Sequence, residues 1–353
     1  MRILLTGATG FLGQWVVQRA LERGHSLVLV VRPGRRLTGL PWAKSMQVQW
    51  VEADLSNPAC TAALGQALAG VDVVVHAAGA MSGTYAQQLR NTVEPTRHLL
   101  GAMVQTACRR LVLISSLSVY GYAALPDKAQ LDEMTPLEQD LSGRDAYCRA
   151  KLAQEALARE QAQTQGMVVT TLRPGMIFGP RRLWSARLGS AKGPMGLLIG
   201  GHATLPLSYV AHCAAAVVLA AERRAIHSDL HVVPDCAGNL GAFEAINVID
   251  DEQLTQLKYL ALLRSNGARA PRWVVCLPWR LLTRVAGLVE MAVFGVPWLG
   301  SRLPGLLHTG TLQARFKPLR FSNSRLRQRL GWKQEISLSQ ALHRSTALRG
   351  QFL

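Results

Sequence analysis

Short apolar runs alternate with stretches of helical length through the first 180 residues, and this alternation constrains the fold more than any other feature. The runs are rich in Val, Ile and Leu, as in strands buried on both faces. They are Ile3–Thr6, Leu27–Val31, Val48–Val51, Val71–Val75, Leu111–Ser115 and Val168–Leu172. The stretches between them include Gly13–Arg23, Ala59–Ala69, Tyr85–Ala107 and Arg144–Gln163. The alternation predicts βαβ units in an α/β fold with a doubly wound parallel sheet, whose ligand lies outside the carboxyl ends of the strands.

A glycine-rich turn directly follows the first apolar run. Gly7, Gly10 and Gly13 stand in the sequence TGATGFLG, between a predicted strand and a predicted helix. Glycines permit a tight turn and a close approach of pyrophosphate, and the helix N-terminus offers free N–H groups. The spacing is GxxGxxG and not GxGxxG, but its position between strand and helix predicts a dinucleotide site.

The end of the second predicted strand bears on the type of dinucleotide. Val31 occupies the place where a carboxylate would meet a free ribose 2′-hydroxyl, and Arg32, Arg35 and Arg36 follow it. Arginine suits a 2′-phosphate instead. We therefore predict NADP(H) as the preferred cofactor and NAD(H) as the alternative. The competing interpretation is that these arginines form a solvated loop.

The pattern changes after Pro180, where glycine, proline and arginine become frequent and the periodicity weakens. We expect a cofactor-binding domain over residues 1–180 and a smaller substrate-binding cap over 181–353, mostly helical and interleaved with the first domain. Within the second region the sequence predicts a strand at 231–234 and helices at 210–225, 250–266 and 337–348.

The strongest chemical signal is a tyrosine and a lysine four residues apart, with serines upstream. Tyr147 and Lys151 share one face of a predicted helix, and Ser115 and Ser116 end the fifth predicted strand. An ammonium beside a phenol stabilises the phenolate and lowers the pKa of the tyrosine, so that it can exchange a proton with an alkoxide. A serine hydroxyl can hydrogen-bond the same oxygen. His76 follows the fourth run, and a lone histidine at such a position is more often structural than catalytic.

Charge is the most unusual part of the composition. The net charge is +17, and residues 261–353 carry fifteen Arg or Lys against two Glu, a net of +13. This asymmetry is typical of contact with nucleic acid, an anionic membrane or an acidic ligand, and equally of a plain basic surface. The chain has no basic repeat interleaved with aromatics and no zinc-type spacing, so we expect neither nucleic acid as a partner nor a metal.

The remaining composition bears on the compartment. The six cysteines include no CxxC pair, which favours a reducing compartment, and the apolar run after Arg2 is too short for a signal peptide. No apolar stretch reaches the length of a membrane span. Residues 273–299 are nevertheless largely apolar and hold three tryptophans, which fits an interfacial anchor or a core helix. We expect a cytoplasmic protein, with peripheral contact at the inner face of a membrane as an open alternative.

Together these motifs resemble the extended short-chain dehydrogenase/reductase family, which also contains the epimerases and dehydratases. The resemblance covers nearly the whole chain. It includes TGATGFLG, Asp54-Leu55, HAAG at 76–79, Asn91, LISSLSVYG at 113–121, the Tyr147/Lys151 pair and RPGMIFGP at 173–180. It implies a Rossmann fold with a C-terminal substrate-binding subdomain, and a homodimer formed through the helices that hold Asn91 and Tyr147.

The resemblance also implies roles for individual residues. Tyr147 would be the acid/base, Lys151 would lower its pKa and bind the nicotinamide ribose, and Ser116 would orient the substrate oxygen. Asn91 would join a proton relay, Asp54 would bind the adenine, and Pro174 would lie near the carboxamide. The full set of implied cofactor contacts is Gly7, Thr9, Gly10, Phe11, Leu12, Gly13, Arg32, Asp54, Leu55, Ala77, Ala78, Tyr147, Lys151 and Pro174.

Within the family, three features resemble the 3β-hydroxysteroid dehydrogenase and dihydroflavonol-reductase branch. These are VRPG after the second strand, residues 198–211 and the apolar segment 273–299. The segment after Pro180 has no acidic residue up to 208 and is expected to supply an apolar substrate lining. The expected lining residues are Leu183, Trp184, Leu188, Met195, Leu197, Leu198 and Ile199. Packing within the cap is the other interpretation of these side chains.

Three functions are compatible with these motifs. The first is an NAD(P)-dependent oxidoreductase of a hydrophobic carbonyl or alcohol, sterol-like or oxoacyl and potentially carrier-linked. The second is a nucleotide-sugar epimerase with tightly bound NAD, in which Arg181, Arg182 and Arg187 grip a diphosphate. Dehydration is not expected, because Leu117 and Ser118 follow Ser116 where a dehydratase needs an acid/base pair. The third is a cofactor-sensing binding protein without activity, since fold does not fix function.

Overall fold

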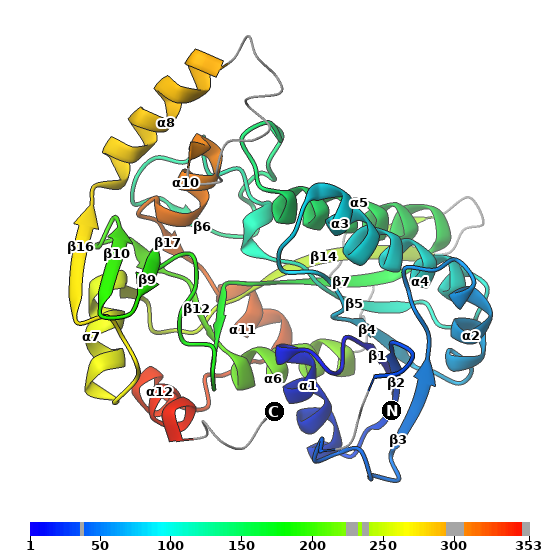
Figure 1. Cartoon of the computed structure of the whole chain (residues 1–353). Coiled ribbons are helices and arrows are strands. Elements are labelled where there is room, and N and C mark those ends of the chain that lie inside the picture. Colours follow the sequence, from blue (N-terminus) through cyan, green and yellow to red (C-terminus); the bar gives the residue numbers. More distant parts are fainter. Residues whose placement is uncertain (36–38, 224–231, 235–239, 294–306, 348–353) are drawn as a thin grey trace.

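An eight-stranded sheet forms the centre of the protein, as seen in a computed structural model that describes residues 1–35, 39–223, 232–234, 240–293 and 307–347 (Figure 1). The strand order is β13-β14-β7-β5-β4-β1-β2-β3, and all neighbours run parallel except β13, which is antiparallel to β14. The bounds are β1 Arg2–Thr6, β2 Ser26–Val31, β3 Val48–Glu52, β4 Val73–His76, β5 Arg110–Ile114, β7 Val168–Pro174, β13 Val232–Pro234 and β14 Leu240–Val248. The predicted α/β fold with a doubly wound parallel sheet is confirmed.

Helices cover both faces of this sheet (Figure 1). One layer contains α1 Phe11–Glu22, α6 Val210–Glu222 and α11 Ser324–Leu330. The other contains α2 Cys60–Ala67, α4 Glu94–Val104 and α5 Ala146–Gln165. Strand β1 shows why both layers form: Leu5 faces the core under α1 and α6, while Leu4 faces the core under α2 and α4, and both are fully buried. Apolar runs without alternation are therefore the expected sequence of such strands.

The stretch Tyr85–Ala107, expected as one helix, is divided. It consists of α3 Tyr85–Gln88, a π-helical turn over Leu89–Val93 and α4. Pro95 has no N–H to donate to the carbonyl of Asn91, so a regular α-helix cannot continue through this point. The π-turn sits beside the glycine-rich turn, where such irregularities often accompany function.

Helix α5 carries Tyr147 and Lys151, and its position is fixed at three places. Asp145 caps its first turn by accepting a hydrogen bond from the backbone N–H of Cys148 at 2.9 Å. Gly166 ends it in the left-handed conformation at φ 62°. In between, Glu155 forms a buried bidentate ion pair with Arg173 of β7, with N···O distances of 2.9 and 2.6 Å.

The chain beyond Pro180 adds to the main sheet and also builds a second lobe. Its contribution to the sheet is β13 and β14, and β14 has no counterpart in the strands expected from the sequence. In the part that the structure describes, the second lobe contains a three-stranded sheet and several helices (Figure 1). Its elements are β9 Ser190–Lys192, β10 Met195–Ile199, β16 Trp273–Leu277, α7 Gln256–Ser265, α8 Trp279–Val293, α10 Thr309–Phe316 and α12 Leu338–Ala347.

Short strand pairs join the two lobes. They are β8 Met176–Phe178 with β12 Leu207–Tyr209, β11 Thr204–Leu205 with β15 Leu254–Thr255, and β6 Gln130–Leu131 with β17 Arg320–Phe321. Among the described residues, no helix combines the length and the apolar character that crossing a bilayer requires.

Candidate active site

The glycine-rich turn closes on itself at the carboxyl end of β1. The N–H of Gly10 donates to the carbonyl of Gly7 at 2.9 Å, and α1 begins at the next residue. A Cβ on Gly13 would lie 2.0 Å from the Gly7 oxygen, and one on Gly7, at φ +76°, would lie 2.7 Å from the Ala77 backbone. Only glycine allows this approach of turn, helix and β4, so the cradle fits a dinucleotide pyrophosphate at the helix N-terminus.

Two adjoining cavities open at this end of the sheet and share Gly7, Gly10, Ala77 and Gly79. The larger, about 600 Å³, extends toward the second lobe, and we call it the reaction cavity. The smaller, about 290 Å³, extends toward the end of β2, and we call it the β2 cavity. All the cofactor contacts implied by the sequence resemblance line one of the two. Those in the reaction cavity are Phe11, Leu12, Gly13, Tyr147, Lys151 and Pro174. Those in the β2 cavity are Thr9, Arg32, Asp54, Leu55 and Ala78. Those that line both cavities are Gly7, Gly10 and Ala77.

Ser116 and Tyr147 meet in the reaction cavity. Ser116 follows β5 and lines the cavity beside Tyr147, and its hydroxyl acts to lower the pKa of the phenol. Its Oγ also accepts from the backbone N–H of Ser118 at 3.1 Å, which fixes its orientation. The hydroxyl groups of Ser115 and Ser118 also belong to this cavity wall and are buried without a hydrogen-bond partner among the described residues. Ser116 is therefore the serine of this wall whose hydroxyl can meet a substrate oxygen beside the phenol.

Lys151 lies beneath the ring of Tyr147 in a fully buried hydrogen-bond network. Its Nζ is 6.0 Å from the ring centre and donates to the Ile114 carbonyl and to Oε1 of Gln154, both at 2.8 Å. Burial lowers the pKa of this ammonium to about 8. The arrangement leaves Lys151 beside the ring and beside Gly79, whose Cβ position would be 3.5 Å from Nζ.

The electrostatics of Tyr147 differ from the sequence expectation. Burial raises the pKa of the phenol above its ordinary value, and the groups that oppose this rise are the Ser116 hydrogen bond and the charge of Arg182. The Lys151 ammonium donates its hydrogen bonds to Ile114 and Gln154, so it acts on the phenol through its charge, 6.0 Å from the ring centre. The net result is a raised pKa and not the expected lowered one, so Tyr147 is a phenol at neutral pH.

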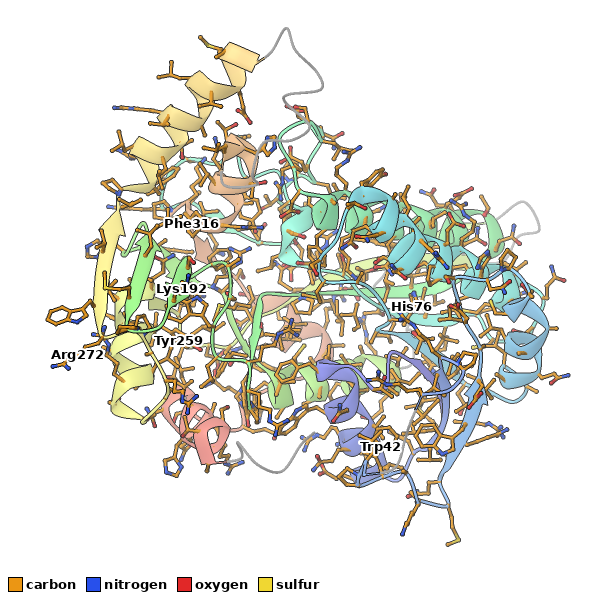
Figure 2. All side chains as sticks on the ribbon, viewed as in Figure 1. Trp42, His76, Lys192, Tyr259, Arg272 and Phe316 are labelled. Carbon is orange, nitrogen blue, oxygen red and sulfur yellow. The ribbon has the colours of Figure 1, made fainter. Side chains whose placement is uncertain are left out.

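The network continues from Lys151 to the glycine-rich turn. Nε2 of Gln154 donates to Oγ1 of Thr96 at 2.7 Å, and Thr96 lies 2.9 Å from Nε2 of His76. His76, which is labelled in Figure 2, ends β4, and its Nδ1 lies 2.7 Å from the hydroxyl of Thr6 at the end of β1. Burial lowers the pKa of His76 to about 3, so this histidine is neutral. The sequence favours a structural character for His76 but does not identify Gln154 or Thr96, because their contacts join residues far apart in the chain.

Asn91 lies apart from the Ser116–Tyr147–Lys151 group. It stands in the π-helical turn, lines the β2 cavity, and donates from Nδ2 to the carbonyl of Gln87 at 2.9 Å. Thr92 is the neighbour that faces Gly79 and therefore the side of Lys151. The π-turn thus holds Asn91 on the side of the β2 cavity.

Arginines and one aspartate surround the β2 cavity. Arg32 and Arg35 both line it, while Arg36 lies outside the described residues. Oδ1 of Asp54 accepts from the backbone and hydroxyl of Ser56 at 3.0 and 2.8 Å, and these bonds lower the pKa of its carboxyl. The cavity thus presents two exposed guanidinium groups beside an ionised carboxylate.

The substrate side of the reaction cavity is built differently from the expectation. Of the seven apolar residues expected there, only Trp184 lines it. Leu188, Leu198 and Ile199 are buried in the protein core, Leu183 packs against that core, and Met195 and Leu197 are exposed on β10. The apolar lining consists instead of Met81, Met176, Ile177, Trp184, Ala186 and Ala314. Arg144, Arg182, Arg187 and Arg315 also reach this cavity.

A glycine cradle at the β1–β4 switch point, joined to a serine, tyrosine and lysine group over one cavity, defines a nicotinamide-dependent enzyme of the short-chain dehydrogenase/reductase superfamily. The chain belongs to the NAD dependent epimerase/dehydratase family, whose sequence pattern matches residues 3–233. The expectation of an enzyme is thereby confirmed, and the interpretation as a binding protein without activity is set aside.

Two curated relatives and one solved structure describe the likeness further. The chain is 27% identical to a 3-beta-hydroxysteroid dehydrogenase of Mycolicibacterium neoaurum, over 97% of this chain and 89% of that protein. It is 32% identical to a 2-alkyl-3-oxoalkanoate reductase of Stenotrophomonas maltophilia, over 51% of this chain and 52% of that protein. A UDP-glucuronic acid 4-epimerase from Bacillus cereus, crystallised with NAD, superposes with a TM-score of 0.68 at 20% identity, over 99% of this chain and 100% of that one. This last likeness shows the fold alone.

Proposed function

We propose that this enzyme transfers hydride between NADP(H) and a hydrophobic carbonyl or alcohol, of the sterol-like or oxoacyl type. The observation that carries the proposal is the placement of Ser116, Tyr147 and Lys151 in the wall of one cavity with the glycine cradle, which also has apolar walls. The dehydrogenase and the reductase among its relatives support the same class of reaction.

In the proposed mechanism the chain's own residues handle the proton, and the bound nicotinamide supplies or accepts the hydride. The substrate oxygen accepts hydrogen bonds from Ser116 and Tyr147, which orients the carbon toward the cradle. In reduction the Tyr147 phenol gives its proton to the developing alkoxide, and in oxidation the phenolate takes it back. The Lys151 ammonium, held by Ile114 and Gln154, places a positive charge beneath the ring that stabilises the phenolate.

The preference for NADP(H) is supported by the side chains at the end of β2. Arg32 and Arg35 line the β2 cavity, and Val31 there brings no carboxylate to bind a ribose 2′-hydroxyl. We expect NADPH to bind at least about tenfold more tightly than NADH. Replacing both residues in an Arg32→Ala/Arg35→Ala variant should weaken NADPH binding and leave NADH binding nearly unchanged, as read by titration of cofactor fluorescence.

The direct test of the function is turnover. Purified enzyme with NADPH should consume the reduced cofactor in the presence of hydrophobic ketones, including 3-oxosteroids and 2-alkyl-3-oxo acids with long chains. Small polar ketones of the same reactivity serve as the control and should turn over poorly, because the apolar wall cannot desolvate them favourably. Absence of turnover across the panel, by an enzyme that binds NADPH, would refute the proposed substrate class.

Nucleotide-sugar epimerisation is the second candidate, favoured by the arginines of the reaction cavity. Arg182 and Arg187 are placed to meet a diphosphate, whereas Arg144 and Arg315 are already paired with Glu138 and Asp145. Epimerisation predicts that NAD copurifies in stoichiometric amount and that UDP-sugars are interconverted without net consumption of cofactor. Protein that purifies without bound NAD and reduces ketones would exclude it.

We further propose that the enzyme works in the cytoplasm as a homodimer. The five cysteines among the described residues are all free thiols, which supports a reducing compartment. The family resemblance supports a dimer through the surface of α3, α4 and α5. Mass photometry of the purified chain would test the dimer directly.

A further inference from the structure

A continuous apolar surface lies on the outer side of the second lobe. It consists of the outward side chains of β10, β16 and α8, and we call it the outer apolar face. Its members, with their exposed fractions, are Met195 52%, Leu197 36%, Trp273 61%, Val275 51%, Leu281 56%, Val285 44%, Leu288 65% and Met291 73%. Soluble proteins rarely leave so many large apolar side chains exposed together, so such a patch marks an interaction site.

The secondary structure makes this face continuous. β10 and β16 run parallel with Met195 opposite Trp273 and Leu197 opposite Val275, so these four side chains project from one side of the small sheet. β16 leads directly into α8 through Pro278, and both lie along the outer edge of the molecule (Figure 1). On α8, Leu281, Val285 and Leu288 follow at spacings of four and three and form one exposed stripe.

The opposite side of α8 is fixed to the body of the enzyme. Ala286 is fully buried and packs with Ile199, Leu312 and Phe316, and Leu282 borders the same cluster. Glu290 accepts hydrogen bonds from the backbone N–H and the hydroxyl of Thr309 at 3.1 and 2.8 Å. The helix is thus held by one side against α10 and keeps its exposed stripe outward. Because Thr311, Ala314 and Arg315 of α10 line the reaction cavity, a single helix separates the outer apolar face from the active site.

Positive charge surrounds this face. Lys192, Arg269, Arg272 and Arg284 are exposed around it, and Arg272 projects from the outer edge of the lobe (Figure 2). Over residues 187–199 and 268–293 the sequence contains one acidic residue, Glu290, which is engaged with Thr309. An apolar stripe bordered by arginines matches a surface that offers both anionic headgroups and an acyl interior.

We propose that the outer apolar face docks on an anionic lipid bilayer as a peripheral membrane contact. Trp273 and the α8 stripe enter the interface between headgroups and acyl chains, while the surrounding basic side chains bind lipid phosphates. A second copy of the chain fits this face less well, because a two-fold interface would bring the same arginines against one another. The docking also places the α10 wall of the reaction cavity close to the bilayer.

Vesicle flotation with the full chain tests this proposal. Wild-type protein should float with vesicles of phosphatidylglycerol and phosphatidylcholine, bind pure phosphatidylcholine vesicles about tenfold less, and lose binding as salt increases. A Leu281→Glu/Leu288→Glu variant should lose vesicle binding about tenfold or more. Met46→Glu, at a fully exposed methionine far from this face, is the matched control and should bind as wild type does.

The charge requirement is tested separately. Arg272→Glu/Arg284→Glu should abolish the preference for anionic vesicles, whereas Lys44→Glu, at an exposed lysine elsewhere, should not. Circular dichroism and NADPH binding check that each variant is folded. Wild-type protein that stays in solution with every vesicle overturns the proposal. It is also overturned if the Leu281→Glu/Leu288→Glu variant binds vesicles normally, or if that variant only converts a dimer to a monomer, which would make the face an interface between copies.

Discussion

At the scale of single residues, the site depends on which hydrogen bonds each polar group already makes. Tyr147 lies with Ser116 in the wall of the reaction cavity, and the buried ammonium of Lys151 donates to Ile114 and Gln154. Tyr147 therefore donates the proton and Lys151 supplies the positive charge, so mutation of each residue tests each role by itself.

Replacing the phenol tests the proton donor. Tyr147→Phe keeps the ring and its packing but removes the hydroxyl, so kcat should fall about 10²–10⁴-fold. The Kd for NADPH should change little, because the cradle is intact. Steady-state kinetics and cofactor titration measure the two effects, and retention of more than a tenth of the activity would show that another group donates the proton.

The pH dependence should report the buried ammonium. The pKa of Lys151 is lowered by burial to about 8, whereas the pKa of Tyr147 is raised. Below a pH of about 8 both groups carry their protons, and above it the ammonium becomes neutral first. For reduction, kcat/KM should therefore be level at low pH and decline as the pH rises through about 8. Lys151→Met should lower kcat/KM at low pH and remove its decline at high pH. If the variant keeps the decline unchanged, a group other than Lys151 causes it.

Gln154 is a positioning residue, because it acts through Lys151. Gln154→Leu removes an acceptor that favours the charged amine, so the pH decline should move downward and kcat should fall about tenfold. Gln154→Glu adds a negative charge and should move the decline upward. Gln163→Leu, at an exposed position of the same helix, serves as the control. A purely structural role for Gln154 would lower stability in both variants without opposite shifts of the pH profile.

At the scale of elements, the junction of β1 and α1 determines cofactor binding. Gly7, Gly10 and Gly13 bring the strand, the turn and the helix into backbone contact, and β4 passes behind them. The helix N-terminus can then meet the pyrophosphate without an intervening side chain.

Adding one methyl group at this junction should force the strand, the turn and the helix apart. In Gly13→Ala the new Cβ would lie 2.0 Å from the Gly7 oxygen. Relieving this overlap requires the backbone to move, which costs more free energy than a side-chain rotation. We expect a loss of about 1–3 kcal/mol of stability and at least tenfold weaker NADPH binding. Gly65→Ala in α2 is the control: its Cβ would meet nothing within 4 Å, so it should stabilise the protein by about 0.4–1 kcal/mol. Thermal denaturation and titration compare them, and similar behaviour of the two variants would argue against a close-packed cradle.

At the scale of the whole molecule, the sequence pattern predicted those features of the fold that depend on residues close together in the chain. The six strands predicted in the first 180 residues and the glycine-rich turn follow from apolar runs and residue type, and they agree with the structure. The π-turn at Leu89–Val93 was not predictable, because its residues continue the helical pattern of the stretch around it. The prediction of the substrate lining was wrong because the lining depends on contacts between residues far apart in the chain. Leu198, for example, packs in the protein core and not in the cavity wall.

The two lobes are also more interlocked than a boundary at residue 180 suggests. β14 supplies a strand of the main sheet, and Thr311 of α10 donates to the carbonyl of Gly143 at 3.3 Å, just before α5. Arg315 pairs with Asp145, the residue that caps α5, at 3.0 Å. The second lobe therefore helps to hold the helix that carries Tyr147 and Lys151.

This interlocking predicts one cooperative unfolding transition, with bound cofactor stabilising both lobes together. At an NADPH concentration of about one hundred times Kd, binding contributes about 2.7 kcal/mol, which should raise Tm by roughly 4 °C. Scanning calorimetry with and without NADPH measures the shift, and NADH at the same concentration should give a smaller one. Two transitions, of which only one moves with the cofactor, would mean that residues 1–180 and 181–353 unfold independently. The contacts of α10 with the start of α5 could not then fix the position of Tyr147.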